Sequence, residues 1–201
     1  MRIALGLKAH SGWAALIALG TDDGGLRVAD RRRVELVEEA DAHWARQPYH
    51  AAEGLSPSKA REVVQRGIES AHRLARREVQ AAMQRARSAG HDLAACAVLV
   101  SEPMPAWSVD EILAVHFRMH KAEGVLFRDA LARAVEASGL CLVAIPEKRL
   151  TEHAEQALAT PAAAVMKRIA ALGKSVGPPW GKDQKDAALA AMIALQSPSR
   201  G

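Results

Sequence analysis

The chain has few aromatic residues, few cysteines and no long apolar run. Aromatic residues make up 3% of its 201 residues, and only two residues are cysteines. Cys96 and Cys141 lie in apolar, strand-like runs without a CxxC partner, which excludes a cysteine-based zinc or redox motif and favours two core positions. No apolar run approaches the roughly 20 residues that span a bilayer. The sequence therefore predicts a protein with no membrane partner.

Two short motifs are also missing. Residues 3–7 are apolar, but Lys8 and His10 interrupt the run and no small-residue cleavage site follows, so the start does not predict a secretory signal. Gly173-Lys-Ser175 is similar to the end of a phosphate-binding loop, but Arg168 occupies the place of its first glycine. These absences favour a cytoplasmic location and exclude a P-loop nucleotide site.

What is present fits one globular domain. Hydrophobic residues make up 49% of the chain and charged residues 25%, and the formal net charge is +4. A mildly basic chain is compatible with a nucleic-acid partner but does not require one. We expect a single domain over residues 1–196 and a flexible tail over 197–201.

Five apolar runs predict five strands. Gly12 and its neighbours predict a tight turn between the first two strands, which makes them a hairpin. The third run alternates polar and apolar residues, as an antiparallel edge strand does, and the fourth is continuously apolar, as a buried parallel strand is. The five ranges are Arg2–Lys8, Trp13–Leu19, Leu26–Val37, Leu93–Ser101 and Leu140–Ile145.

Helical spacing predicts helices after the third strand. Pro57, preceded by the potential cap Ser56, begins a helix that continues to about Ser88, and residues 38–54 before it are expected to be irregular. Ser108-Val-Asp-Glu111 forms a capping box, which predicts a helix from there to about Ser138, with a break near Gly124. The remaining helices are Leu150–Leu172, divided at Pro161, and Lys182–Leu195. The element order β-β-β-α-β-α-β-α predicts an α/β fold.

Three stretches place charged residues at the ends of strands and at the start of a helix. The first is the strand end Leu5-Gly6-Leu7-Lys8-Ala9-His10-Ser11, and the second is Val98-Leu99-Val100-Ser101-Glu102. The third is Asp183-Gln-Lys-Asp186, which is followed by an alanine-rich apolar face. Together they resemble the RuvC-like group of Holliday-junction resolvases within the ribonuclease-H-like superfamily. The resemblance implies a mixed five-stranded sheet of order 3-2-1-4-5 with flanking helices. In that order the ends of the first and fourth strands are neighbours.

The resemblance also implies a two-metal phosphodiesterase centre. Hard carboxylate ligands suit Mg²⁺ or Mn²⁺, and two such ions can activate water and hold the leaving oxygen. Glu102, Asp183 and Asp186 would be the metal ligands and catalytic residues, and nucleic acid would be the partner of a possible homodimer. The group has an aspartate where this chain has Lys8. A lysine there would repel the ions and pair with a carboxylate.

Three functions remain open from the sequence. The chain could be a nuclease relative with a degenerate metal site that associates with nucleic acid without catalysis. It could also be an active metal-dependent nuclease in which a group such as His10 replaces the missing ligand. The third alternative is a phosphate- or nucleotide-binding module, since actin-like ATPases share this core, although their second glycine-rich loop is missing here.

Two further groups of residues are candidate binding sites. Four arginines of the helix predicted from Pro57 to about Ser88, and two residues near the implied metal centre, could contact nucleic acid. They are Arg66, Arg73, Arg76, Arg77, Trp180 and Lys182. The alternative is a solvated helix face with i, i+4 ion pairs and a tryptophan packed under a loop. His116, His120 and Glu123 share one helix face at i, i+4 and i+7, which makes them a possible transition-metal set or a solvated polar stripe.

Overall fold

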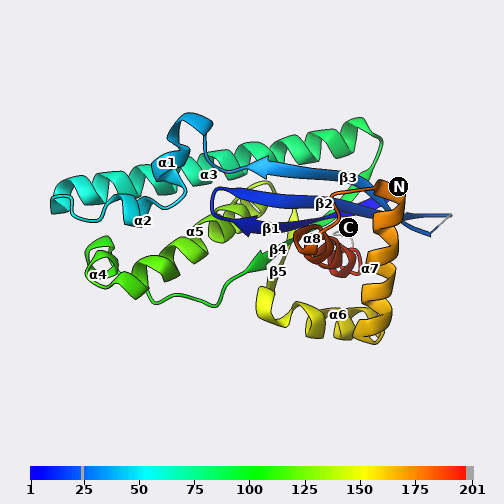
Figure 1. Cartoon of the computed structure of the whole chain (residues 1–201). Coiled ribbons are helices and arrows are strands. Elements are labelled where there is room, and N and C mark those ends of the chain that lie inside the picture. The colour runs from blue at the N-terminus through cyan, green and yellow to red at the C-terminus, as the bar shows by residue number, and fades with distance from the viewer. Residues whose placement is uncertain (24, 198–201) are drawn as a thin grey trace.

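The computed structural model describes residues 1–23 and 25–197, and its five strands form one sheet in the order β3-β2-β1-β4-β5. The strands are β1 Arg2–His10, β2 Trp13–Asp22, β3 Gly25–Glu35, β4 Asp92–Val100 and β5 Cys141–Pro146. β1 pairs antiparallel with β2 and parallel with β4 (Figure 1). The predicted α/β class and the mixed five-stranded sheet of order 3-2-1-4-5 are therefore confirmed.

The hairpin between β1 and β2 is longer than predicted. Only Ser11 and Gly12 form the turn, and Gly12 has a φ of +86°. His10 still pairs with Trp13, and their rings stack with centroids 4.4 Å apart. The expected four-residue turn is thus wrong, because a two-residue turn with a positive-φ glycine lets both strands continue. His10 consequently belongs to β1.

Helices cover both faces of the sheet (Figure 1). α3 (Pro57–Ser88) and α5 (His116–Ala137) cover one face, and α8 (Lys182–Ala194), together with α6 and α7, covers the other. The shorter elements are η1 Glu39–Asp41, α1 Ala42–Ala45, α2 Pro48–Ala51, α4 Val109–Leu113, η2 Glu147–Arg149, α6 Leu150–Leu158 and α7 Ala162–Val176. The helix start at Pro57 and the division at Pro161 agree with the sequence, although Ser56 makes no side-chain capping bond.

Two helix predictions are wrong. Residues 38–54, expected to be irregular, contain η1, α1 and α2, because Tyr49 and Ala52 are buried in an apolar cluster with residues of α3 and α5. The Ser108 capping box is present, but the helix breaks at Ala114–Val115 and not at Gly124. Gly124 lies inside α5, where a Cβ would meet nothing within 4 Å, so this glycine is not needed for a bend or a close contact.

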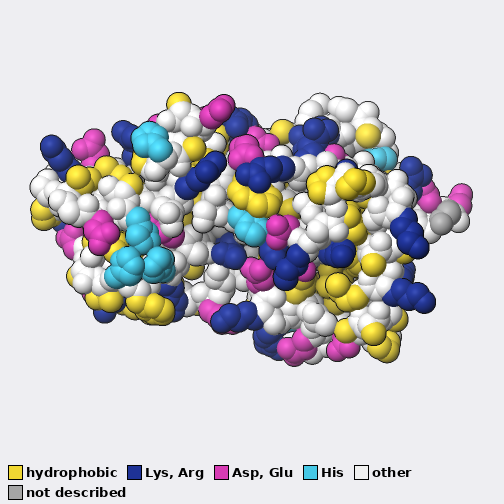
Figure 2. Space-filling view, in the orientation of Figure 1, with side chains coloured by type: hydrophobic (Ala, Val, Ile, Leu, Met, Phe, Trp, Pro, Cys, Tyr) yellow, Lys and Arg dark blue, Asp and Glu magenta, His cyan; other side chains and the backbone are white. Residues whose placement is uncertain are grey.

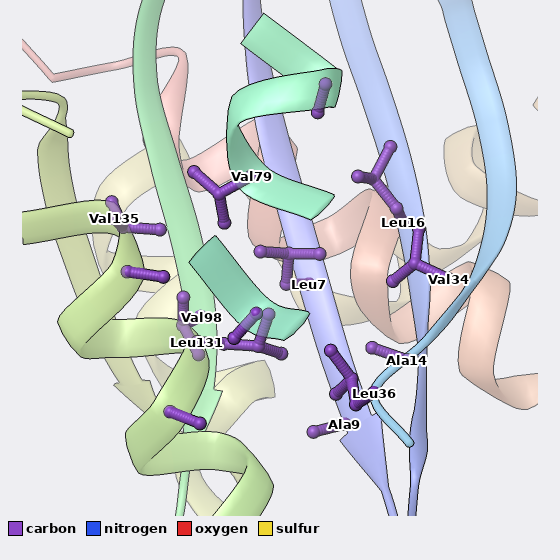
Figure 3. Close-up of a cluster of buried hydrophobic side chains, with 14 of the residues drawn as sticks. Leu7, Ala9, Ala14, Leu16, Val34, Leu36, Val79, Val98, Leu131 and Val135 are labelled. Carbon is purple, nitrogen blue, oxygen red and sulfur yellow. The ribbon is translucent and has the colours of Figure 1, made fainter. Parts of the chain in front are cut away.

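Side chains of β1 alternate between two apolar cores. Leu7 and Ala9 belong to the core under α3 and α5, together with Leu16, Val98 and Leu131 (Figure 3). The alternate residues of β1 point to the other face, where the second core contains much of α8. Lys8 lies between Leu7 and Ala9, so its side chain projects toward α8.

Gly6 lets α8 lie against the backbone of β1. A Cβ at Gly6 would overlap the carbonyl oxygen of Ala187 and lie 2.7 Å from the amide nitrogen of Ala191. All eight residues from Ala187 to Ala194 are buried, and five of them are alanines. Small residues on both elements allow this close approach, which brings the first turn of α8 beside the end of β1.

Two further predictions concern the chain as a whole. Among residues 1–23 and 25–197, no helix has both the length and the apolar character needed to cross a membrane. The predicted flexible tail, residues 197–201, lies outside the described residues except for Ser197. Cys96 is buried as expected, whereas Cys141 is partly buried, and both thiols are free.

Candidate functional site

The ammonium group of Lys8 lies among three carboxylates. Its Nζ is 2.6 Å from Asp186 Oδ2, 3.1 Å from Glu147 Oε1 and 3.4 Å from Asp183 Oδ1. The Lys8 side chain is only 4% exposed, while the three acids are partly exposed. We call these four residues the lysine cluster. A nearly buried cation of this kind needs charge partners, and it has them.

Three elements that are distant in the sequence supply the lysine cluster. Lys8 comes from the end of β1, and Glu147 is the first residue of η2, directly after β5. Asp183 and Asp186 lie at i and i+3 in the first turns of α8, so they share a helix face. Gln184 Oε1 accepts a hydrogen bond of 2.9 Å from the Gly181 amide, which fixes the start of this helix.

Glu147 is the residue that sequence reasoning missed. It bridges two cations, because Arg128 Nη2 donates a 2.7 Å hydrogen bond to the carboxylate oxygen that Lys8 does not contact. Its signal in the sequence is like that of Glu102, since both acids lie within two residues of the end of a parallel strand.

Electrostatics keeps Lys8 and Glu147 of the lysine cluster ionised. Burial disfavours the charged form of Lys8, but hydrogen bonds with Asp186 and Glu147 outweigh it and raise the pKa of Lys8 above its ordinary value. Burial likewise disfavours ionised Glu147, yet the hydrogen bonds from Arg128 and Lys8 lower the pKa of that carboxyl. Lys8 and Glu147 therefore stay charged at neutral pH.

His10 and Lys182 lie at the edge of the lysine cluster. His10 Nε2 is 3.0 Å from Asp183 Oδ1 without hydrogen-bond geometry, and its ring stacks on Trp13. Lys182 Nζ lies 2.5 Å from Asp186 Oδ2. Its side chain is 78% exposed, so the same carboxylate has one nearly buried and one solvated lysine partner. Figure 2 shows histidine, acidic and basic side chains close together on this part of the surface.

Glu102 does not join the lysine cluster. It is exposed and, within the described part of the chain, forms no ion pair with Lys8; its charge acts on Arg149 instead. Of the three acids predicted from the sequence, Asp183 and Asp186 therefore contact Lys8 and Glu102 is not among its ion-pair partners. Ser101 and Glu102 continue past the end of β4 as an irregular segment, whereas η2 turns Glu147 back toward β1.

A cleft of about 590 Å³ opens beside the lysine cluster. Its lining includes Glu102 and Glu147, but also four cations: Lys121, Arg128, Lys148 and Lys182. Two of these cations, Arg128 and Lys182, are paired with carboxylates of the lysine cluster. The cleft has more positive than negative side chains, so its chemistry suits an anion such as a phosphate group.

The lysine cluster does not fit the two divalent ions that the resemblance implies. Its three carboxylates are directed at an ammonium group, which is within 3.4 Å of each of them. A metal ion at the same point would face the fixed positive charge of Lys8, with strong repulsion at such a short distance. What this arrangement can do is hold the ends of β1, η2 and α8 together without a metal.

The other predicted nucleic-acid residues have varied surroundings. The Arg66 guanidinium lies 4.1 Å from the Trp44 ring centroid, and Arg73 and Arg77 share the Glu38 carboxylate, while Arg76 is exposed. Trp180 packs against Gly173, and its Nε1 donates a 3.0 Å hydrogen bond to the Ile169 carbonyl. Trp180 therefore packs between α7 and α8 rather than offering a free stacking surface.

The set His116, His120 and Glu123 is only partly brought together. His116 and His120 converge, but their third neighbour is His50 of α2, which the sequence did not indicate. Glu123 is buried and accepts hydrogen bonds from the other side of His50. We call His50, His116 and His120 the histidine cluster.

Comparison with known proteins finds solved structures with a similar backbone path but no sequence match. No protein-family profile matches the chain, and no curated protein matches it significantly. Among solved structures, it is similar to RuvC of Thermus thermophilus, with 16% identity, a TM-score of 0.48 and coverage of 95% of this chain and 92% of that one. The complex of T. thermophilus RuvC with a Holliday junction substrate gives 16% identity, a TM-score of 0.47 and coverage of 96% and 92%.

Proposed function

We propose that this chain is a RuvC-like nuclease relative in which an ion-pair cluster replaces the metal centre, and that it binds nucleic acid without cleaving it. The observation that carries the proposal is the 2.6 Å contact between Lys8 and Asp186. The sheet order supports the comparison of Lys8 with a metal-binding aspartate, because β1 is central and its end faces α8. The tethered ammonium neutralises acids that would otherwise attract Mg²⁺ or Mn²⁺.

The nucleic-acid part of the proposal rests on the cleft beside the lysine cluster. Lys121 and Lys148 line it and, among residues 1–23 and 25–197, form no ion pair with a carboxylate, and Lys148 is exposed. Cations of this kind can neutralise backbone phosphates and release counterions. Arg76 of α3 would contact backbone phosphates in the same way, at a second place and independently of the nucleotide sequence.

A cleavage assay tests the loss of catalysis. Labelled branched, duplex and single-stranded DNA are incubated with the full chain and Mg²⁺ or Mn²⁺, and we expect no product above background. Cleavage that disappears in the Asp186→Asn variant would establish the active hydrolase instead and overturn this proposal.

A Lys8→Asp variant tests the proposed relation to a metal centre. Replacing the ammonium by a fourth carboxylate leaves the acids without an internal cation, so we expect Mn²⁺ binding that the parent chain lacks, measured by calorimetry. Lys174→Asp is the matched control, since it makes the same charge change at an exposed position of α7. Equal Mn²⁺ binding by both variants would argue against the proposal.

A binding titration at several salt concentrations tests the cleft. We expect the double variant Lys121→Ala, Lys148→Ala to weaken DNA binding and to lower the slope of log K against log salt by about 0.9 for each lost phosphate contact on duplex DNA. The control Lys59→Ala, Lys174→Ala removes the same charge from exposed positions elsewhere. Absence of binding by the parent chain at low salt contradicts the proposed partner. Analytical ultracentrifugation tests the implied homodimer.

A further inference from the structure

Three histidines from two separate helices converge at the surface, away from the lysine cluster. His50 belongs to α2, and His116 and His120 occupy successive turns of α5. One ring nitrogen of each lies within 4.8 Å of the other two, and the Nε2 atoms of His116 and His120 are 3.0 Å apart. Two imidazoles on one tetrahedral ion, at about 2.0–2.1 Å, would have nitrogens about 3.3 Å apart. Only small side-chain shifts are therefore needed to place an ion between them.

A buried carboxylate orients one of these histidines. Glu123 is 6% exposed, and His50 Nδ1 lies 2.7 Å from its Oε2. The His50 backbone amide donates to the same carboxylate over 3.1 Å, and Gln47 Nε2 donates over 3.3 Å. With Nδ1 protonated toward Glu123, Nε2 of His50 carries the lone pair that a metal needs. A carboxylate behind the ligating ring is the arrangement usual for metal-bound histidine, and it also makes the ring a stronger donor.

The fold holds this arrangement in place. Tyr49 is buried beside His50, and Pro48 begins α2 in close contact with Gly67 of α3, where a Cβ would lie 2.5 Å from the Pro48 Cβ. Met119, between the two α5 histidines, packs into the same apolar cluster. His50 is thus fixed by α2 and by Glu123, while His116 and His120 are exposed. Figure 2 shows histidine side chains gathered on this surface.

We propose that His50, His116 and His120 bind a transition-metal ion of the Zn²⁺ type, with Glu123 as the positioning residue of His50. Imidazole nitrogen is a preferred ligand of Zn²⁺, and of Cu²⁺ and Ni²⁺, but not of Mg²⁺. Three protein ligands leave a fourth position for water or another small ligand on the exposed side. Neither the three histidines nor Glu123 belongs to the lysine cluster, so the two proposals can fail separately.

Metal titration of the untagged, metal-depleted full chain tests this site. We expect one Co²⁺ per chain with the visible absorption of four-coordinate cobalt, and Zn²⁺ should displace it. At a Zn²⁺ concentration about 100 times the Kd, the melting temperature should rise by roughly 5–10 °C. His120→Ala should abolish both effects, whereas His43→Ala, at an exposed histidine of α1, should leave them unchanged.

Further variants separate ligation from folding. Glu123→Gln should weaken Zn²⁺ binding about 10- to 100-fold, with a circular dichroism spectrum like that of the parent chain. The exposed His116→Ala variant covers the case in which Glu123→Gln does not fold, and it too should lose Co²⁺ absorption. Failure of the parent chain to bind Zn²⁺ more tightly than millimolar, or Zn²⁺ binding by His116→Ala and His120→Ala that equals that of the parent chain, would overturn the proposal.

Discussion

The lysine cluster and the histidine cluster both unite side chains from distant parts of the chain, but only the first contains its own cation. In the lysine cluster, an ammonium group lies within 3.4 Å of three carboxylates. In the histidine cluster, three imidazoles converge and the nearby carboxylate is already bonded to His50. Converging ligand atoms therefore indicate a metal site only where no side chain supplies the positive charge. This distinction depends on how the side chains are arranged and cannot be made from residue types alone.

The largest expected effect comes from removing the internal cation. Lys8→Leu leaves Glu147, Asp183 and Asp186 facing one another without their central partner, and breaking one side of a nearly buried ion pair costs about 3–5 kcal/mol. Urea unfolding of the two proteins should show this loss of unfolding free energy. A loss below about 1 kcal/mol would mean that solvent screens the acids and that Lys8 contributes little.

Placing a lysine in the histidine cluster should give the second-largest effect. His120→Lys places an ammonium in the histidine cluster and removes one ligand, so Zn²⁺ affinity should fall by more than roughly 100-fold, beyond the effect of losing a hydrogen bond to a ligating histidine. A competing chelator measures this Kd. If His120→Lys keeps its affinity, a fixed cation does not decide between the clusters.

Acid should weaken the lysine cluster through Glu147. Because the pKa of Glu147 is lowered in the folded chain, its stabilising contribution is complete above its unfolded pKa of about 4.3 and is lost as pH falls through the folded pKa. Glu147→Gln should thus cost about 1–2 kcal/mol at neutral pH, and this difference should vanish toward pH 2.

The pH dependence has a matching alkaline limit. The raised pKa of Lys8 means that its contribution persists below its unfolded pKa, about 10.4, and declines only as pH rises through the higher folded value. Unfolding free energies between pH 6 and 9 should therefore show a constant difference between the parent chain and Glu147→Gln. A difference that changes across this range would show that another group titrates in the cluster.

The smallest effect is expected at the other lysine on Asp186. Lys182 lies 2.5 Å from the same oxygen as Lys8, yet its side chain is 78% exposed, so Lys182→Ala should cost less than about 1 kcal/mol. Urea unfolding compares it directly with Lys8→Leu. Equal losses would show that burial does not separate the two ion pairs.

The sequence predicted the sheet order and part of each cluster, and the missing parts have physical reasons. Strand alternation and a continuous apolar run are sufficient to predict the strands β1 to β5, whereas their order in the sheet is implied by the family resemblance. The i, i+3 or i, i+4 spacing pairs Asp183 with Asp186 and His116 with His120. These signals are local.

Glu147 and His50 depend instead on tertiary packing. Choosing between Glu102 and Glu147 requires knowing how the chain leaves β4 and β5, because each acid lies within two residues of its strand end but only Glu147 begins a 3-10 turn. His50 reaches α5 because α2 packs on Gly67, and nothing in residues 38–54 indicates that contact.

Lys8 has a further consequence for how the chain depends on its surroundings. A carboxylate centre neutralised by divalent ions has a stability that varies with the free concentration of those ions. A covalently attached counterion cannot be diluted or removed by a chelator, and it cannot exchange. The lysine cluster therefore makes the junction of β1, η2 and α8 independent of divalent-ion supply, so that EDTA and Mg²⁺ should leave the unfolding of the Zn²⁺-free chain unchanged.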